Sequence, residues 1–186
     1  MLGQSVQIKK GKELSNIELT LINNARVAHF NSKNTIRPSP ENEDWEKLYF
    51  LKYTESGELG VFARYHNVLI EFNGKNYEVL GSATLIALIP GKGYGAEVKK
   101  EMIRYTMEQG KTSIGFCNPK LSKYYKSLGC GIIIDGARRF YQREQDGNLK
   151  QFLIGNDVLY IEGKDQLIQE ILKSPDLPVI CGRYHW

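Results

Sequence analysis

The stretch at residues 85–96 constrains the fold of this chain more than any other segment. A hydrophobic strand runs into three glycines at alternate positions, Gly91, Gly93 and Gly95, and a helix begins directly after them. Glycine tolerates positive backbone φ angles and lets another group approach the main chain closely. The free amides at the start of a helix favour an anion, above all phosphate, and Lys92 adds a cation. The segment therefore predicts a strand–turn–helix unit whose turn is able to hold a phosphate group.

The hydrophobic periodicity of the remaining chain predicts an α+β fold. A capping box at Ser15 and Glu18 precedes apolar residues at helical spacing, and Asn73 with Gly74 between two β-rich runs indicates a hairpin. We expect helices at residues 13–29, 96–109, 120–128 and 165–172, and a short one at 43–48. We expect strands at residues 48–53, 59–72, 77–89, 112–117, 131–135, 152–154, 158–161 and 179–181. Antiparallel strands therefore precede a βαβαβ segment.

Composition and charge exclude several classes of protein. The 186 residues are 41% hydrophobic and 25% charged, as in ordinary globular proteins, and we expect one domain over residues 1–186. The net charge of +4 comes from Lys and Arg spread along the chain, so we predict no nucleic-acid partner. No apolar run approaches the ~18 residues that cross a bilayer, so we predict no membrane segment. Three widely spaced cysteines (Cys117, Cys130 and Cys181) and three scattered histidines predict a cytoplasmic protein with reduced thiols and no metal site.

The glycine turn has several possible explanations: three kinds of phosphate-bearing ligand, and a purely structural turn. A Walker phosphate loop is excluded because no Gly-Lys-Ser or Gly-Lys-Thr ends the turn. A dinucleotide-binding turn matches formally, since Gly91, Gly93 and Ala96 have the spacing of its fingerprint, but residues 111–118 contain no acidic side chain to bind a ribose. A turn for the pyrophosphate of coenzyme A, and a turn that only packs by its glycines, both remain open on this segment alone.

A second motif follows the next predicted strand, and the two motifs together resemble one family. Residues 118–130 read Asn-Pro-Lys-Leu-Ser-Lys-Tyr-Tyr-Lys-Ser-Leu-Gly-Cys. The pair resembles the GNAT superfamily of acyl-CoA-dependent N-acyltransferases, whose members read Gln/Arg-x-x-Gly-x-Gly/Ala in the loop and Asn-x-x-Ala-x-x-x-Tyr-x-x-x-Gly-Phe after it. Asn118, Tyr125 and Gly129 fall on the positions of the family motif, whereas Pro90 and Cys130 depart from them.

The resemblance implies a fold, a cofactor and a set of binding residues. The fold is a mixed, mostly antiparallel sheet flanked by helices, in which two central parallel strands, here residues 80–89 and 112–117, splay apart. The cofactor is acetyl-CoA, which binds to a half of the domain at about residues 79–135. The residues assigned to cofactor binding are Leu88, Ile89, Gly91, Lys92, Gly93, Tyr94, Gly95, Ala96, Asn118 and Tyr125.

Tyr125 is the candidate catalytic residue. Under the resemblance its phenol protonates the departing thiolate, because phenol and thiol have comparable pKa values. A tyrosine that only packs at a helix end is the alternative. Glu71, Glu78 and Asp135 are candidates for a general base, but each is also explained as a solvated charge, and members of the family often use ordered water instead.

A second resemblance, carried by residues outside the cofactor motifs, concerns the acceptor. Asp44-Trp45-Glu46 before the first long strands, Leu69-Ile70 before the hairpin turn, and a chain ending in Trp186 are similar to the aminoglycoside 2′-N-acetyltransferases. The resemblance implies that Trp186 binds the substrate and that the partner is a small-molecule primary amine, including an aminoglycoside-like amino sugar. A protein amine as acceptor, a non-catalytic acyl-CoA sensor and a homodimer remain open.

Overall fold

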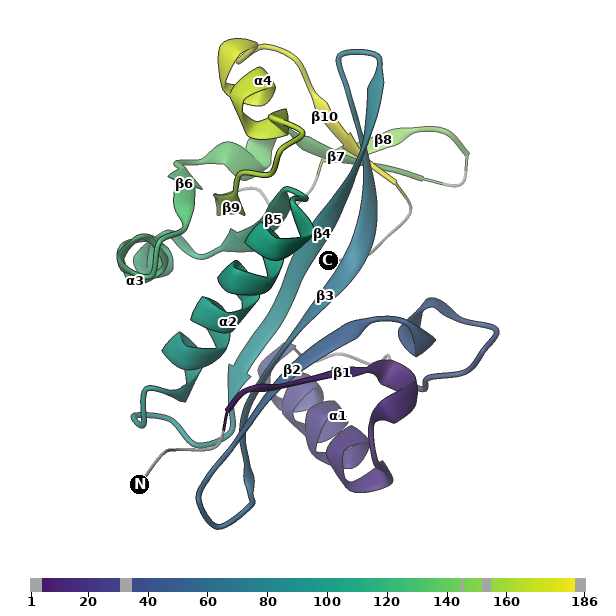
Figure 1. The fold of residues 1–186 in the computed structure, drawn as a ribbon. Helices are drawn as coiled ribbons and strands as arrows, with labels where there is room; N and C mark the ends of the chain where they lie inside the picture. Colours follow the sequence, from purple (N-terminus) through teal and green to yellow (C-terminus); the bar gives the residue numbers. More distant parts are fainter. Residues whose placement is uncertain (1–4, 31–34, 145, 152–154, 183–186) are drawn as a thin grey trace. The chain divides into compact units, whose positions relative to one another are not determined.

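The computed structural model describes residues 5–30, 35–144, 146–151 and 155–182 (Figure 1). They form two compact units, of which the first consists of Met1–His66 and Ala83–Met102 and the second of Asn67–Ser82 and Ile103–Trp186. The strands β3 (Leu59–Phe72) and β4 (Lys75–Ala87) and the helix α2 (Tyr94–Gln109) each contribute residues to both units. None of the described helices is long and apolar enough to cross a membrane.

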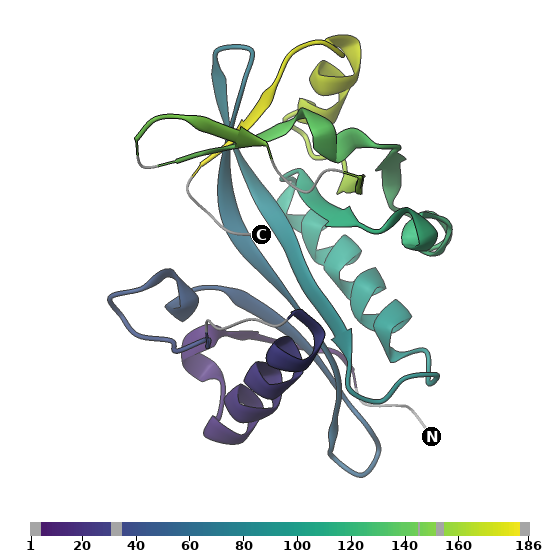
Figure 2. The ribbon, with the colours of Figure 1, turned by 180° about the vertical axis from the view of Figure 1, so that it is seen from behind.

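The first unit combines a small antiparallel sheet with one long helix. The strand β1 (Gln7–Lys10) pairs with β2 (Leu48–Tyr53), and β2 pairs with the first part of β3. The short helices η1 (Gly11–Glu13) and η2 (Glu43–Trp45) flank these strands, and α1 (Asn16–Phe30) lies against one face of β2 and β3 (Figure 2). The core between them contains Ile22, Ala25, Leu51 and Phe62. On the opposite face, the Tyr65 hydroxyl donates to the carbonyl of Met102 at 3.3 Å.

The predicted capping box opens α1 and leads into a buried ionic contact. The Glu18 carboxylate accepts a hydrogen bond from the Ser15 amide, and the Ser15 hydroxyl accepts one from the Glu18 amide. Glu18 also accepts from Lys9 at 2.7 Å and from the Tyr53 hydroxyl, so it joins α1 to β1 and β2. Burial raises the pKa of Glu18, but these hydrogen bonds together outweigh that effect and hold the pKa at about 2.

The second unit is an eight-stranded sheet with helices on both faces. Its strand order is β6-β9-β5-β4-β3-β10-β7-β8. The strands not yet introduced are β5 (Ser113–Cys117), β6 (Gly131–Ile133), β7 (Phe140–Arg143), β8 (Leu149–Gln151), β9 (Asp157–Ile161) and β10 (Val179–Cys181). The helical segments are η3 (Pro119–Leu121), α3 (Ser122–Ser127), η4 (Gly136–Arg139) and α4 (Leu167–Lys173). The β4–β5 and β7–β10 pairs are parallel.

Alternation along β5 and β9 divides the second unit into two hydrophobic layers. Ile114 and Val158 face a layer that contains the apolar side of α4. Cys117, Leu159 and Ile161 face the other layer, which is completed by residues from α2, α3 and β6. Helices thus flank the sheet of the second unit, as the family resemblance implied.

Element types agree with the sequence prediction more closely than element ends do. The helix expected at 96–109 begins at Tyr94, and the strand expected at 77–89 ends at Ala87. Sequence analysis missed β1 and the β7–β8 hairpin, because their polar strands lack a hydrophobic alternation. Asp146 and Gly147 were an available turn signal for that hairpin, and Gly147 adopts a φ of 88°. The strand predicted at 152–154 lies outside the described residues.

Candidate cofactor-binding site

The glycine turn belongs to the first unit, and two of its three glycines are required by the backbone. Gly91 and Gly93 have φ angles of 80° and 78°, a region that side chains with a Cβ rarely adopt. A Cβ atom at either position would meet nothing within 4 Å among the described residues. The turn therefore presents exposed main chain that no neighbouring side chain fills, which suits close approach of a phosphate group. Gly95 already lies inside α2.

The start of α2 leaves amides directed at this turn. The Gly93 carbonyl accepts hydrogen bonds from the amides of Ala96 at 3.0 Å and Glu97 at 3.3 Å, so it is the first acceptor of the helix. The amides of Tyr94 and Gly95 precede these bonds and have no partner inside the helix. Together with the helix dipole they favour a negative charge, and the exposed Lys92 lies in the same turn.

A β-bulge in β3 fixes both ends of the turn. The register between β2 and β3 shifts by one residue between Lys52 and Tyr53, which leaves Gly60 as the extra residue on β3. The Gly60 carbonyl accepts hydrogen bonds from the amides of Leu88 at 2.9 Å and Ile89 at 3.0 Å. These two predicted cofactor residues therefore use their amides to hold the turn against β3.

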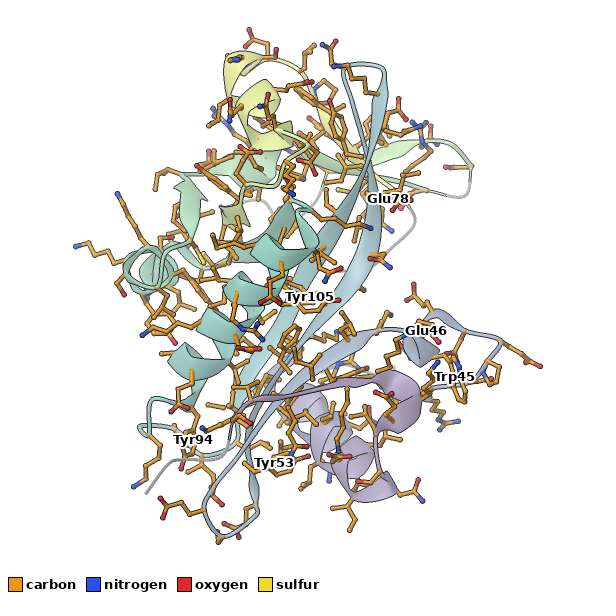
Figure 3. All side chains as sticks on the ribbon, viewed as in Figure 1. Trp45, Glu46, Tyr53, Glu78, Tyr94 and Tyr105 are labelled. Atoms are coloured by element: carbon orange, nitrogen blue, oxygen red, sulfur yellow. The ribbon has the colours of Figure 1, made fainter. Side chains whose placement is uncertain are left out.

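The far end of the turn packs on the same glycine. A Cβ atom on Gly60 would lie 2.8 Å from the Tyr94 ring, which Figure 3 shows at the first turn of α2. The ammonium of the buried Lys52 pairs with Glu97 at 2.6 Å and lies 5.9 Å from the centre of the Tyr94 ring. Sequence analysis missed Gly60 and Lys52, although a glycine inside a strand is a known signal for a bulge or close approach.

The second unit holds the parallel strands that the resemblance placed at the thioester. Residues 80–82 of β4 pair with residues 113–115 of β5, and the described pairing ends there. β4 continues five residues further, to Ala87, and β5 continues two further, to Cys117. Thr84 has a φ of 58°, which interrupts the regular extended geometry of β4 just after the paired segment.

Asn118 caps the helical segment that follows β5. Its side-chain oxygen accepts a hydrogen bond from the Lys120 amide at 3.0 Å, and its carbonyl accepts one from the Leu121 amide at 2.8 Å. Asn118 therefore acts as the cap of this helical segment. The exposed side chain of Asn118 is held in one orientation at the end of the strand.

Tyr125, and not its neighbour Tyr124, faces the protein interior. The Tyr125 side chain packs against the layer formed by Cys117, Cys130, Leu159 and Ile161, whereas Tyr124 is 39% exposed. The two rings make an edge contact with centres 5.2 Å apart. Burial, and then the nearby Cys117, raises the pKa of Tyr125 to about 12, so the phenol stays protonated at neutral pH.

A buried carboxylate fixes the helix that carries Tyr125. Asp157, at the start of β9, accepts a hydrogen bond from the Ser122 hydroxyl and another, at 2.8 Å, from the Asp135 amide. Ser122 lies one helical turn before Tyr125 on α3. This contact therefore sets the position of α3 against the sheet, and sequence analysis did not identify it.

The three candidates for a general base each have an ion-pair partner in the second unit. Glu71 pairs with Arg143 at 2.7 Å, and the exposed Glu78 pairs with Lys111 at 3.0 Å. Asp135 lies 3.6 Å from Arg138. These contacts agree with the interpretation of all three as solvated charges. Trp186, the predicted substrate residue, lies outside the described residues.

Comparisons with known proteins identify the fold. No family model and no curated protein sequence matches the chain. Among solved structures, Escherichia coli ElaA matches with a TM-score of 0.57 at 16% identity, over 86% of this chain and 100% of that one. The GNAT family N-acetyltransferase YhbS from Escherichia coli, in complex with CoA, matches with a TM-score of 0.54 at 13% identity, over 97% of this chain and 90% of that one.

A third match extends the comparison to an enzyme with a bound amine. Spermidine N-acetyltransferase from Vibrio cholerae, in complex with CoA and spermine, matches with a TM-score of 0.54 at 13% identity, over 88% of this chain and 98% of that one. The protein therefore has the fold of the GNAT N-acetyltransferases, as its two sequence motifs predicted.

Proposed function

We propose that this protein is an N-acetyltransferase that moves an acetyl group from acetyl-CoA to a primary amine of a small molecule. The observation that carries the proposal is the glycine turn, in which Gly91 and Gly93 hold open, positive-φ main chain at the start of α2. Its support from comparison is a fold shared with two proteins solved in complex with CoA.

In this proposal the turn binds the pyrophosphate of the cofactor. The amides of Tyr94 and Gly95 donate to phosphate oxygens, and Lys92 contributes its positive charge. The bulge at Gly60 keeps the turn in one conformation before the ligand arrives, so little conformational entropy is lost on binding. The amides of Leu88 and Ile89 anchor the turn, and the Leu88 side chain packs against the core of the first unit.

Tyr125 supplies the proton that the leaving group needs. The neutral amine attacks the thioester carbonyl, a C–N bond forms and the C–S bond breaks. The thiolate takes the Tyr125 proton, the amine nitrogen gives a proton to water, and solvent reprotonates the phenolate. With a pKa of about 12 against an ordinary value of 10.0, the phenol is about a hundredfold weaker as an acid than a free tyrosine. Burial in the same site raises the pKa of the departing thiol for the same reason, which keeps the two acids comparable.

A cofactor panel tests the proposal. Thermal shift and calorimetry are run with CoA, acetyl-CoA and NAD on the full chain. Stabilisation by CoA and acetyl-CoA but not by NAD supports the acyltransferase, whereas stabilisation by NAD alone supports the dinucleotide-binding alternative and refutes the proposal. Binding of acetyl-CoA without release of free thiol in the presence of any amine indicates the non-catalytic sensor.

An amine panel then addresses the acceptor. Polyamines, amino acids, aminoglycosides and a peptide with a free amino terminus are compared by detection of free CoA thiol. The Vibrio cholerae neighbour was solved with spermine, which makes polyamines a rational first group. Removal of Trp186 is expected to weaken the affinity for the acceptor and to leave the affinity for acetyl-CoA unchanged. If the deletion changes neither affinity, the assignment of Trp186 to the acceptor is wrong.

A further inference from the structure

A group of mostly basic and polar side chains in the first unit, four of them buried, has no part in the function proposed above. We call it the basic cluster, and its members are Arg26, Asp44, Lys47, Tyr49, Arg64 and His66. In the β2–β3 register Tyr49 lies directly opposite Arg64, so the two side chains share a face of the sheet. His66 follows two residues after Arg64 on the same face. Arg26 comes from α1, one turn after the core residue Ile22.

Lys47, Tyr49, Arg64 and His66 are buried although their side chains are polar, whereas Arg26 and Asp44 are partly buried. Tyr49, Arg64 and His66 are 0%, 6% and 4% exposed. Burial, followed by the charges of Arg64 and Lys47, lowers the pKa of His66 to about 3, so the imidazole is neutral at physiological pH. Burial and then the charge of Arg64 also lower the pKa of Arg26. The environment is therefore poor in water and rich in positive charge.

The carboxylates in and beside the cluster, those of Asp44 and Glu43, already pair with Lys47. Asp44 pairs with Lys47 at 2.9 Å, and Lys47 also pairs with Glu43. Among the described residues, Arg64 forms no ion pair with a carboxylate and its Nε has no hydrogen-bond partner, and the Tyr49 hydroxyl, which accepts from Arg64, donates its own proton to no acceptor. Buried donors without partners are costly, and they are rare in native proteins.

We propose that the basic cluster is a binding site for an oxyanion group, a carboxylate or a phosphate, of a small molecule. The Arg64 guanidinium, the Arg26 guanidinium and the Tyr49 hydroxyl are the donors, and an oxyanion offers two or more acceptor oxygens to a planar guanidinium. Neutral His66 adds bulk without a competing negative charge. The site is distinct from the glycine turn, which uses main-chain amides, and the proposal does not depend on catalysis.

The test follows the arginine Nε–H signals of the full chain by nuclear magnetic resonance. Inorganic phosphate and acetate are titrated separately at constant ionic strength, which distinguishes the two oxyanion sources. We expect saturable shifts of the Arg64 and Arg26 signals with at least one anion, and a rise in Tm of about 3–6 °C at ten times its Kd. The exposed Arg104 is the internal reference. No saturable shift with either anion, as expected for a site filled by water, overturns the proposal.

Two variants separate a binding role from a structural one. Arg64→Met replaces a buried charge by an apolar side chain of similar length; it is expected to keep or raise Tm and to abolish the anion response. Tyr49→Phe is expected to keep Tm and to weaken anion affinity about 3- to 10-fold. Arg104→Gln, with the same change of charge at the surface, leaves affinity unchanged. A fall in Tm with an unaltered anion response in Tyr49→Phe refutes the site.

Loss of CoA affinity in Arg64→Met shows that the cluster serves the cofactor instead, and it overturns the proposal of a separate site.

Discussion

Replacement of Gly93 by aspartate tests the glycine turn most directly. Gly93 has a φ of 78°, and a Cβ atom there would meet nothing within 4 Å, so a side chain fits in space but is strained in conformation. Aspartate and asparagine tolerate this region better than most residues, and the strain costs about 1–2 kcal/mol for either. The two variants therefore share the strain and differ in charge alone.

The charge determines the size of the effect on CoA affinity. A carboxylate about 5 Å from each of two phosphate charges, at an effective dielectric constant of about 40 for this exposed turn, is repelled by about 3 kcal/mol in total. That value corresponds to about a hundredfold loss of affinity, beyond any loss in Gly93→Asn. Calorimetric titration of CoA into the wild type and both variants measures the difference.

Gly57→Asp is the matched control for folding. Gly57 lies in the turn between β2 and β3, with a φ of 85° and nothing within 4 Å of its ideal Cβ position. The Gly57→Asp variant should lower Tm as much as Gly93→Asp does and should leave the affinity for CoA unchanged. Equal affinities for Gly93→Asp and Gly93→Asn would refute the assignment of the pyrophosphate to this turn, whatever the activity of the protein.

Three further predictions test the catalytic residue, the bulge and the capping box. Tyr125→Phe should lower kcat by about 10- to 1000-fold without a change in KM for acetyl-CoA, whereas Tyr124→Phe should not; equal rates remove Tyr125 from the mechanism. Gly60→Ala should lower Tm by about 3–8 °C because its Cβ meets the Tyr94 ring, and Tyr94→Ala in the same chain should recover part of the loss; strictly additive shifts contradict the contact. Glu18, with a pKa lowered from 4.5 to about 2, contributes about 3 kcal/mol that is fully present above pH 4.5 and is lost as the pH falls through 2. The Tm gap between wild type and Glu18→Gln should close over that interval, and a constant gap argues against the linkage.

Local signals in the sequence predicted the parts of the site that depend on local geometry. Alternating glycines predicted the positive-φ turn, and the segment after the strand at 112–117 predicted a helix over residues 120–128. The capping box at Ser15 predicted the start of α1. Each of these features is decided by residues within about one helical turn of one another.

The features that sequence analysis missed depend on residues distant in the chain. The role of Gly60 requires the register of β2 against β3, and the burial of Lys52 requires its partner Glu97 on α2. The contact that fixes α3 joins Ser122 to Asp157, 35 residues further along the chain. No periodicity in the sequence reports such pairings, because each is set by tertiary packing.

Two residues of the strand β3 lie in environments that their side chains do not ordinarily favour. Glycine at position 60 weakens a strand, yet here it forms the bulge that anchors the glycine turn. Arginine at position 64 would ordinarily face solvent, yet α1 covers that face and buries it beside Tyr49. Such conflicts are expected where function, and not stability, selects the residue. If the basic cluster binds an oxyanion, both conflicts on β3 have the same explanation, since each prepares a site for negative charge.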